Sequence, residues 1–194
     1  GDYLVIISGH CVPCHGSWLQ RLLEPLVEGR VAYTYGRQLG GAETHWSEHM
    51  IFAKYFPAES AIPQQGIYCN NANSALLKTA WEHYRFDETL TGLEDMHLAQ
   101  RLVNDGRKIG YTAEAVVFHY HNERWPQIQR RFEREAFALQ RIRPELTVRK
   151  RDLLRYLVTA VASDLLKAQM NHVPVQQWPN VWKYRLAQYW GSYT

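Results

Sequence analysis

The fold class is decided by LEDMHLAQRLVNDGRKIGYTAEAVVFHYH, residues 93–121. Its first half has the apolar spacing of an amphipathic helix, and Gly106 stands where a glycine ends such a helix. Its second half, from Lys108 to His121, predicts one or two strands. A helix that leads directly into strands is the alternation typical of an α/β sheet.

The same alternation extends towards the N-terminus, and the pattern becomes entirely helical towards the C-terminus. Strands are predicted over residues 3–8 and 31–36. Helices are predicted over residues 18–28, 44–56, 74–84, 125–142 and 152–170, and around 181–190. We therefore expect an α/β part over residues 1–123, followed by a helical extension over residues 124–194.

The first predicted strand is continuously apolar from Leu4 to Ile7 and ends at Ser8, Gly9 and His10. Such a run is typical of a strand that is buried on both faces of a parallel sheet. A central strand needs neighbours on both sides, so a domain rarely begins with one. We expect an N-terminal portion of the domain to be missing from this chain.

Charge is distributed unevenly along the 194 residues, although the net charge is only +3. Residues 1–123 hold nine Lys/Arg and fourteen Asp/Glu, whereas residues 124–155 hold ten Lys/Arg and four Asp/Glu. This basic segment has two interpretations. It is either a solvated helix face or a surface for phosphates and anionic lipid.

Three cysteines, an odd number, argue against a disulfide framework and fit a reducing compartment. The longest apolar candidate, residues 153–166, is interrupted by Arg155 and Asp164 and is too short to span a membrane. These features predict a cytoplasmic location.

Two of the cysteines lie in the run Cys11, Cys14 and His15. This CxxCH spacing is found in haem attachment sites, redox disulfides and zinc sites. A zinc site would need a second Cys/His pair, and Cys69 is the only other cysteine.

Two features at element ends carry groups suited to chemistry. His10 follows a strand, where ligands of open α/β sheets bind, and an imidazole can ligate a metal. Glu94 and Asp95 open a helix after Gly92, which would allow a tight turn. Acidic residues in the first turn stabilise a helix through its dipole, but one of them could instead serve as a general base.

Strand alternation places His119 and His121 on the same face of the last predicted strand. Two such histidines either share a metal or phosphate, or are simply exposed at a strand end. An asparagine cluster, Asn70, Asn71 and Asn73, precedes a predicted helix. Buried amides need partners, which are either a polar ligand or local backbone turns.

Taken together, the order of motifs resembles the inverting glycosyltransferases of family 2, which have the GT-A fold. The resemblance covers about residues 3–121. Its matching stretches are YLVIISGHCVP, WLQRLLEPL, YGRQ, IYCNNANSALLKTAWEHYRFDETLTGLEDMHLAQRLVNDGRKIGY and AEAVVFHYH.

The resemblance implies a partial GT-A-like mixed sheet flanked by helices, with residues 1–123 as the C-terminal half of the transferase domain and without the nucleotide-binding half. The family's DxD metal motif falls on Ser8, Gly9 and His10, which departs from the pattern but leaves His10 as a ligand of Mg²⁺ or Mn²⁺. Asp95, with Glu94 beside it, takes the place of the catalytic base.

The late metal-ligand histidine of the family falls on His119, with His121 as the alternative. The YGRQ stretch is similar to bacterial rhamnosyltransferases and places Arg37 and Gln38 near the donor. Donor contacts are also expected from Asn71 and Asn73. Cys11 and Cys14, directly after the metal-motif strand, are then expected to be packing residues.

The expected activity is transfer of a sugar, with inversion, from a nucleotide-sugar donor to a hydroxyl of a saccharide or lipid-linked acceptor in bacterial polysaccharide biosynthesis. No nucleic acid is expected as a partner. The basic helices over residues 124–170 would contact the inner face of the membrane or, alternatively, form a homodimer contact. Two other classes compete with the enzyme: a degenerate carbohydrate-binding or scaffold relative, and a metal- or haem-binding redox module.

Overall fold

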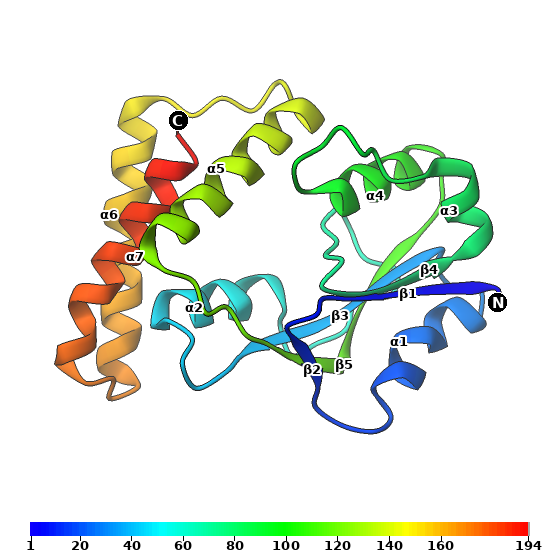
Figure 1. Ribbon diagram of the computed structural model, residues 1–194, viewed down its shortest axis with the longest axis horizontal. Helices are drawn as coiled ribbons and strands as arrows, with labels where there is room; N and C mark the ends of the chain where they lie inside the picture. The colour runs from blue at the N-terminus through cyan, green and yellow to red at the C-terminus, as the bar shows by residue number, and fades with distance from the viewer. Residues whose placement is uncertain (194) are drawn as a thin grey trace. The chain divides into compact units, whose positions relative to one another are not determined.

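A computed structural model of the chain describes residues 1–193, which form a mixed α/β fold with one five-stranded mixed sheet and seven α-helices (Figure 1). The strands are β1 (Tyr3–Ile7), β2 (Cys11–Pro13), β3 (Tyr33–Gly40), β4 (Asn73–Leu77) and β5 (Ile109–His119). The helices are α1 (Trp18–Val27), α2 (Trp46–Tyr55), α3 (Lys78–Tyr84), α4 (Glu94–Asn104), α5 (Trp125–Ile142), α6 (Lys150–Met170) and α7 (Trp178–Gly191).

The chain divides into two compact units. The first contains residues 1–42 and 52–121, and the second contains residues 43–51 and the chain from Asn122 onward. The segment 43–51 therefore groups with the helical extension and not with the α/β part, in contrast to the predicted division at residue 123. Its contacts explain this: Glu48 accepts a hydrogen bond from Arg131 over 2.7 Å, and Trp46 donates to the Asp164 carbonyl over 3.0 Å.

Strand order in the sheet is β1-β4-β3-β5-β2. Only β3 and β5 are parallel, and the other three pairs are antiparallel. Ile7 lies opposite Asn73, and Gly40 lies opposite His119. The C-terminal ends of β1, β3 and β5 therefore meet at one edge of the sheet, together with the beginning of β4.

β1 is an edge strand, so the prediction of a strand buried on both faces is wrong. It pairs with β4, and no second strand pairs with it among residues 1–193. Val5 and Ile7 are each 40% exposed, whereas Leu4 and Ile6 pack against the core. The continuous apolar run has the composition of a central strand, but the pairing decides which side chains are covered.

A second correction concerns residues 74–77, which were predicted to begin a helix. They form β4, and α3 begins at Lys78. Both edges of β4 are occupied, because Leu76 pairs with Leu4 on β1 and with Tyr33 on β3. Two sets of backbone hydrogen bonds outweigh a weak local helix preference.

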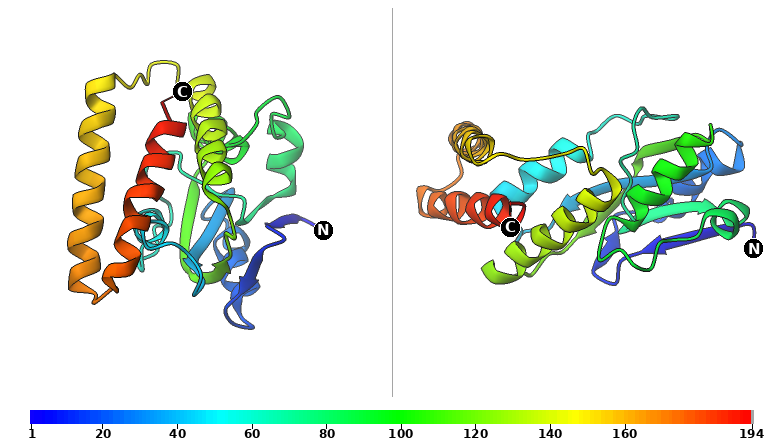
Figure 2. Two further views of the ribbon diagram at one scale, coloured as in Figure 1. Left: turned by 60° about the vertical axis from the view of Figure 1, so that its left-hand side comes forward. Right: turned by 90° about the horizontal axis from the view of Figure 1, so that it is seen from above.

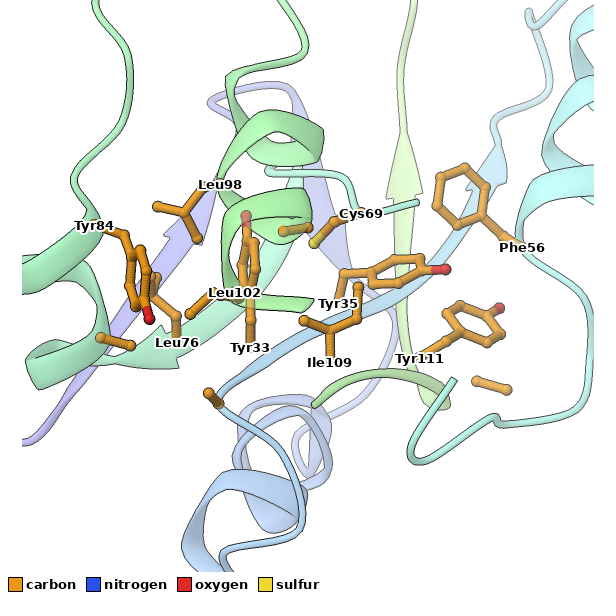
Figure 3. Packing of buried hydrophobic residues seen from close by; sticks show 14 of the residues in the cluster. Tyr33, Tyr35, Phe56, Cys69, Leu76, Tyr84, Leu98, Leu102, Ile109 and Tyr111 are labelled. Atoms are coloured by element: carbon orange, nitrogen blue, oxygen red, sulfur yellow. The ribbon is translucent and has the colours of Figure 1, made fainter. Parts of the chain in front are cut away.

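Helices cover both faces of the sheet, with α1 on one face and α3 and α4 on the other (Figure 1). The larger core lies under α3 and α4 and is shown in Figure 3. Its labelled members are Tyr33, Tyr35, Phe56, Cys69, Leu76, Tyr84, Leu98, Leu102, Ile109 and Tyr111. The smaller core is formed by Leu22, Leu26, Val31, Ala75 and Ala115.

In the second unit, α7 lies between α5 and α6 (Figure 2). Ile128 and Phe132 of α5 pack against Tyr184 of α7. The buried carboxylate of Asp164 accepts two hydrogen bonds from Arg185, over 2.8 and 2.9 Å, which ties α6 to α7. In the part of the chain that the structure describes, no helix is both long and apolar enough to cross a membrane.

Candidate functional site

Three histidines meet at the edge of the sheet where β1, β3 and β5 end. His119 is the last residue of β5, His121 follows two positions later, and His10 lies between β1 and β2. One ring nitrogen from each lies within 4.8 Å of the other two. The ring centroids of His119 and His121 are 4.0 Å apart, and those of His10 and His119 are 4.7 Å apart.

Backbone pairing explains how His10 reaches the other two. The Tyr120 N–H donates to the His10 carbonyl over 3.1 Å, so the β1–β2 connection is held against the end of β5. Cys11, the next residue, lies opposite His119 in the β2–β5 ladder. The three imidazoles therefore come together because of long-range strand pairing.

Hydrogen bonds define which nitrogen of His119 carries the proton. Asn70 Oδ1 accepts the Ala72 N–H over 3.0 Å, which orients the Asn70 amide. The group that faces this oxygen from Gln38 must be a donor, and Gln38 Nε2 lies 2.8 Å from it. Gln38 Oε1 consequently faces His119 Nδ1, over 2.6 Å, and can only accept. His119 therefore carries a proton at Nδ1, and in the neutral imidazole Nε2 is the acceptor nitrogen.

Two further side chains shape the surroundings of the histidines. The Ser8 hydroxyl lies 3.1 Å from His10 Nδ1. The Phe52 ring stacks on His119 with centroids 5.8 Å apart. His119 itself is only 6% exposed, whereas His10 is exposed, so the cluster opens to solvent on the His10 side.

The carboxylate of Asp95 is 6% exposed and accepts two backbone hydrogen bonds. Its Oδ2 accepts the Asn71 N–H over 2.8 Å, and its Oδ1 accepts the Met96 N–H over 2.7 Å. Glu94 is partly exposed, and its Oε1 lies 3.4 Å from Asn71 Nδ2. Leu93 precedes the pair at the helix N-cap.

Leu93 makes the tight turn before Glu94 and Asp95. The sequence had predicted Gly92 for this role. Leu93 has a φ of 57°, in the left-handed region that a branched side chain rarely adopts. Backbone strain of this kind is often found at functional sites. Here it precedes the two carboxylates that open α4.

Adjacent residues of one loop connect the histidines with the carboxylate. Asn70 bonds Gln38, which bonds His119, and Asn71 bonds Asp95. The loop thus brings the predicted metal ligand and the predicted base into one hydrogen-bonded network. Asn70, which the prediction did not include as a site residue, is the central member of this network.

Electrostatics identify the neighbours of Asp95. Burial raises the pKa of the Cys69 thiol well above its usual value, and the negative charge of Asp95 adds to the rise. The pKa of Tyr33 is raised well above its usual value for the same reasons, with burial first and the charges of Cys69 and Asp95 next. Both groups are therefore neutral and hold no competing charge near the carboxylate.

Not every predicted donor-binding residue remains available to a ligand. Asn73 is fully buried: its Oδ1 accepts the Trp18 indole N–H over 2.8 Å, and its Nδ2 donates to the Ala115 carbonyl over 2.7 Å. It holds α1 against the sheet. Asn71 Oδ1 accepts from the Tyr33 and Ser74 hydroxyls, which leaves its Nδ2 facing Glu94.

Arg37 lies next to Gln38 on β3 and is partly exposed. Its Nε is buried and has no hydrogen-bond partner among residues 1–193. Burial raises the pKa of Tyr111, and the positive charge of Arg37 opposes this rise, which places the guanidinium near that ring. Arg37 therefore keeps a donor for an anionic group.

The CxxCH run has neither the geometry nor the protonation state of a redox or haem site. His15 Nδ1 is bonded to the Ser17 hydroxyl and its Nε2 to the Glu114 carbonyl, each over 2.9 Å. Burial raises the pKa of the Cys11 thiol to about 11, so it is a thiol at neutral pH. Neither Cys11 nor Cys14 belongs to any group of three potential metal ligands within residues 1–193.

The donor set of the histidine cluster fits a divalent transition ion, because imidazole nitrogens are common ligands of such ions and one of the three is already oriented by Gln38. The sequence matches no protein-family model. No curated protein matches it significantly either.

Proposed function

We propose that the chain carries the acceptor side of an inverting glycosyltransferase site, which moves a sugar from a nucleotide-sugar donor to an acceptor hydroxyl. The observation that supports this most is the link from His119 through Gln38 and Asn70 to Asn71 and Asp95. It joins a candidate metal ligand and a carboxylate at one edge of an α/β sheet. Ligands of such sheets bind beyond the C-terminal ends of the strands.

In this mechanism the metal site would be formed by His10, His119 and His121. A divalent ion bound there would supply Lewis-acid stabilisation for the departing diphosphate. Gln38 Oε1 faces His119 Nδ1 and would orient the ring, as the outer partner of a metal-bound histidine does. Arg37, whose Nε is buried and unbonded, would donate to a donor phosphate oxygen.

Asp95 would take the proton of the acceptor hydroxyl while that oxygen attacks the anomeric carbon from the face opposite the leaving group, so the configuration inverts. Oδ2 of Asp95 accepts the Asn71 N–H, and Oδ1 accepts the Met96 N–H. These two hydrogen bonds also hold the carboxylate in one orientation. Glu94, which is more exposed, would orient the acceptor hydroxyl.

The test compares Asp95→Asn with Glu94→Gln in the full-length gene product, using release of nucleoside diphosphate from a panel of nucleotide sugars as the readout. A positioned base contributes about a hundred- to ten-thousand-fold, so Asp95→Asn should lose about that much turnover. Glu94→Gln should change the KM for the acceptor more than kcat. An Asp95→Asn protein that folds and keeps most of its turnover would refute the assignment.

A non-catalytic carbohydrate-binding relative is the second candidate, and the observation that favours it is the Ser8 hydroxyl beside His10 in place of a carboxylate. This candidate requires binding of saccharides by the wild-type protein with no turnover of any nucleotide sugar. A redox or haem module is disfavoured by the occupied nitrogens of His15 and the raised pKa of Cys11.

A further inference from the structure

We infer that His10, His119 and His121 form a three-imidazole site that selects a transition ion of the Zn²⁺ or Co²⁺ class and rejects Mg²⁺. The inference names the ion of the proposed active site and rests on the proposed function for the role of that ion. The assignment of His121 as a third ligand, and not as a substitute for His119, follows from its ring nitrogen, which lies within 4.8 Å of a ring nitrogen of each of the other two. The His121 ring centroid lies 4.0 Å from that of His119 and 5.6 Å from that of His10.

Distances between the nitrogens suit one small ion. Metal–nitrogen bonds of about 2.1 Å in a tetrahedral site put two ligand nitrogens about 3.4 Å apart. The three nitrogens lie within 4.8 Å of one another, so closure needs a shift of about 1.4 Å at most. His10 is exposed on a connecting loop, and rotation of its side chain can supply most of that movement.

The chemistry of the ligands decides which ion binds. Mg²⁺ prefers oxygen ligands in an octahedral arrangement, and it is bound mainly through carboxylates and substrate phosphates. This cluster offers three imidazoles, and the group beside His10 is the Ser8 hydroxyl and not a carboxylate. Imidazole suits Zn²⁺ and the later transition ions. Three protein ligands also leave a fourth position for an oxygen of the substrate or water, as in catalytic zinc sites.

Surrounding contacts match those of a metal-bound imidazole. Such a histidine usually donates its second ring N–H to an oxygen acceptor, which orients the ring. Gln38 Oε1 accepts this hydrogen bond from His119 over 2.6 Å. Phe52 covers the face of the same ring and limits its rotation.

Metal binding is tested directly on the purified full-length protein by equilibrium dialysis with elemental analysis, and by the visible absorption of added Co²⁺. We expect one Zn²⁺ per chain, no displacement by a large excess of Mg²⁺, and intense Co²⁺ bands of a tetrahedral site. His121→Ala should weaken Zn²⁺ binding at least about tenfold. His83→Ala, which removes an exposed histidine of α3, is the matched control and should bind as the wild type.

Equal affinity for Mg²⁺, or wild-type Zn²⁺ affinity in folded His121→Ala, overturns the inference. If His121→Ala does not fold, His10→Ala at the exposed loop position gives the same comparison. These readouts do not depend on sugar transfer. If the protein binds Zn²⁺ but turns over no donor, the proposed function is refuted and the metal assignment stands. If the protein transfers sugar and needs Mg²⁺ for it, the metal assignment is refuted and the proposed function stands.

A different observation, in the second unit, carries an independent inference about a partner. α6 presents an exposed apolar ridge at four-residue spacing, with Leu154 and Leu166 each 63% and Met170 78% exposed. α7 presents a second ridge of the same spacing, formed by Trp182, Leu186 and Trp190. Exposed apolar side chains that include tryptophan are typical of surfaces that contact the membrane–water interface.

Exposed charge around these two ridges has one sign. Residues 149–193 expose six Lys/Arg side chains, at positions 149, 150, 151, 155, 167 and 183. The two carboxylates of this segment do not offset them at the surface, because Asp152 is partly buried and Asp164 is buried in its ion pair with Arg185. A surface that combines apolar ridges with positive charge is complementary to anionic lipid.

We propose that the ridge surface of α6 and α7 binds an anionic membrane surface. A second copy of this chain is the less suitable occupant, since it would bring six further positive charges against these six. The proposed surface comprises α6, which lies within the segment 124–170 predicted from charge, and extends it to α7, whereas much of α5 is used for packing in the second unit.

Co-flotation with phosphatidylcholine vesicles, with and without phosphatidylglycerol, tests this surface. We expect binding only to vesicles with phosphatidylglycerol, release by high salt, and loss in the double variant Leu154→Ser/Leu166→Ser. Val27→Ser is the matched control, since Val27 is 64% exposed on α1 in the other unit. Absence of binding at low salt, or a lipid-free dimer that the double variant dissociates, overturns the proposal.

Discussion

The His119 imidazole donates its Nδ1–H to Gln38 Oε1 over 2.6 Å, although 81 residues separate the two in the chain. Parallel pairing of β3 and β5 causes this contact, because Gly40 at the end of β3 lies opposite His119 at the end of β5. The acceptor is an amide and not a carboxylate. It orients the ring and adds no charge beside the candidate metal site.

Replacement of Gln38 by leucine should weaken metal binding. The variant removes the acceptor of His119 and the donor to Asn70, and loss of such an outer partner typically costs about 10- to 100-fold in metal affinity. Unpaired buried groups should also lower the free energy of unfolding by about 1–3 kcal/mol. Zn²⁺ competition titration and urea denaturation measure the two effects. Gln176→Leu, at an exposed position, serves as control, and an unchanged affinity in Gln38→Leu would contradict the role given to this amide.

Gly36→Ala should destabilise the first unit. A Cβ at Gly36 would overlap the Ala115 carbonyl oxygen and the Asn73 side-chain nitrogen, both of which belong to the sheet. Overpacking of this kind costs about 1–3 kcal/mol. Gly16→Ala is the matched control, because nothing lies within 4 Å of its added Cβ. Denaturant titrations that gave the two variants equal stability would show that the strands separate easily at this point.

The second unit should depend strongly on the ion pair of Asp164 and Arg185. Both side chains are buried, and two hydrogen bonds join them. Asp164→Ala leaves the Arg185 charge without its partner and should cost about 3–5 kcal/mol, while the double replacement Asp164→Leu/Arg185→Leu should recover most of the loss. Amide exchange in α6 and α7 reports the change. Arg155→Ala, at an exposed site, should stay within about 0.5 kcal/mol of the wild type.

Thiol reactivity should separate the three cysteines. At about pH 8 a thiol reagent should modify exposed Cys14 first, and Cys69 should react only on unfolding because it is buried and its pKa is strongly raised. Cys11 has a pKa of about 11, so its rate should rise about tenfold per pH unit towards that value. Mass spectrometry of the modified peptides gives the order. Modification of Cys11 before Cys14 at neutral pH would support the interpretation of the CxxCH run as a redox site.

The same raised pKa predicts how Cys11 affects stability at high pH. Because the folded-state pKa lies above the unfolded one, the folded protein holds its proton longer. The contribution of Cys11 to stability is therefore complete below about pH 9 and decreases as the pH rises towards 11. In Cys11→Ser, the free energy of unfolding should change less between about pH 9 and 11 than in the wild type. The same pH dependence in both proteins would contradict a contribution from the raised pKa of Cys11.

Local patterns sufficed for several elements. The α4 helix and its end near Gly106 follow from apolar spacing and from a glycine that has a φ of 76°. Alternation along β5 predicted that His119 and His121 share a side, and their rings lie 4.0 Å apart. In each case the signal is within a few residues of the feature, so pairing with distant segments is not needed to recognise it.

Pairing with strands that are distant in the sequence explains why the prediction for residues 74–77 is wrong. Residues 74–77 have a composition compatible with a helix, but hydrogen bonds to β1 and β3 make them a strand. The surroundings of Asn73 also depend on distant segments, because its amide bonds the Trp18 indole and the Ala115 carbonyl. Neither neighbour is close in the sequence, and no residue-level pattern identifies them.

By itself, the sequence determined the α/β alternation, the helical and basic C-terminal part, and the residue types that could bind a metal or accept a proton. Only the tertiary structure decided that His10, His119 and His121 meet, that Gln38 orients one of them, and that Asn70 and Asn71 connect them to Asp95. The reason is physical. Periodicity reports which side of its own element a residue occupies, whereas a site with several ligands depends on which strands pair and in which register.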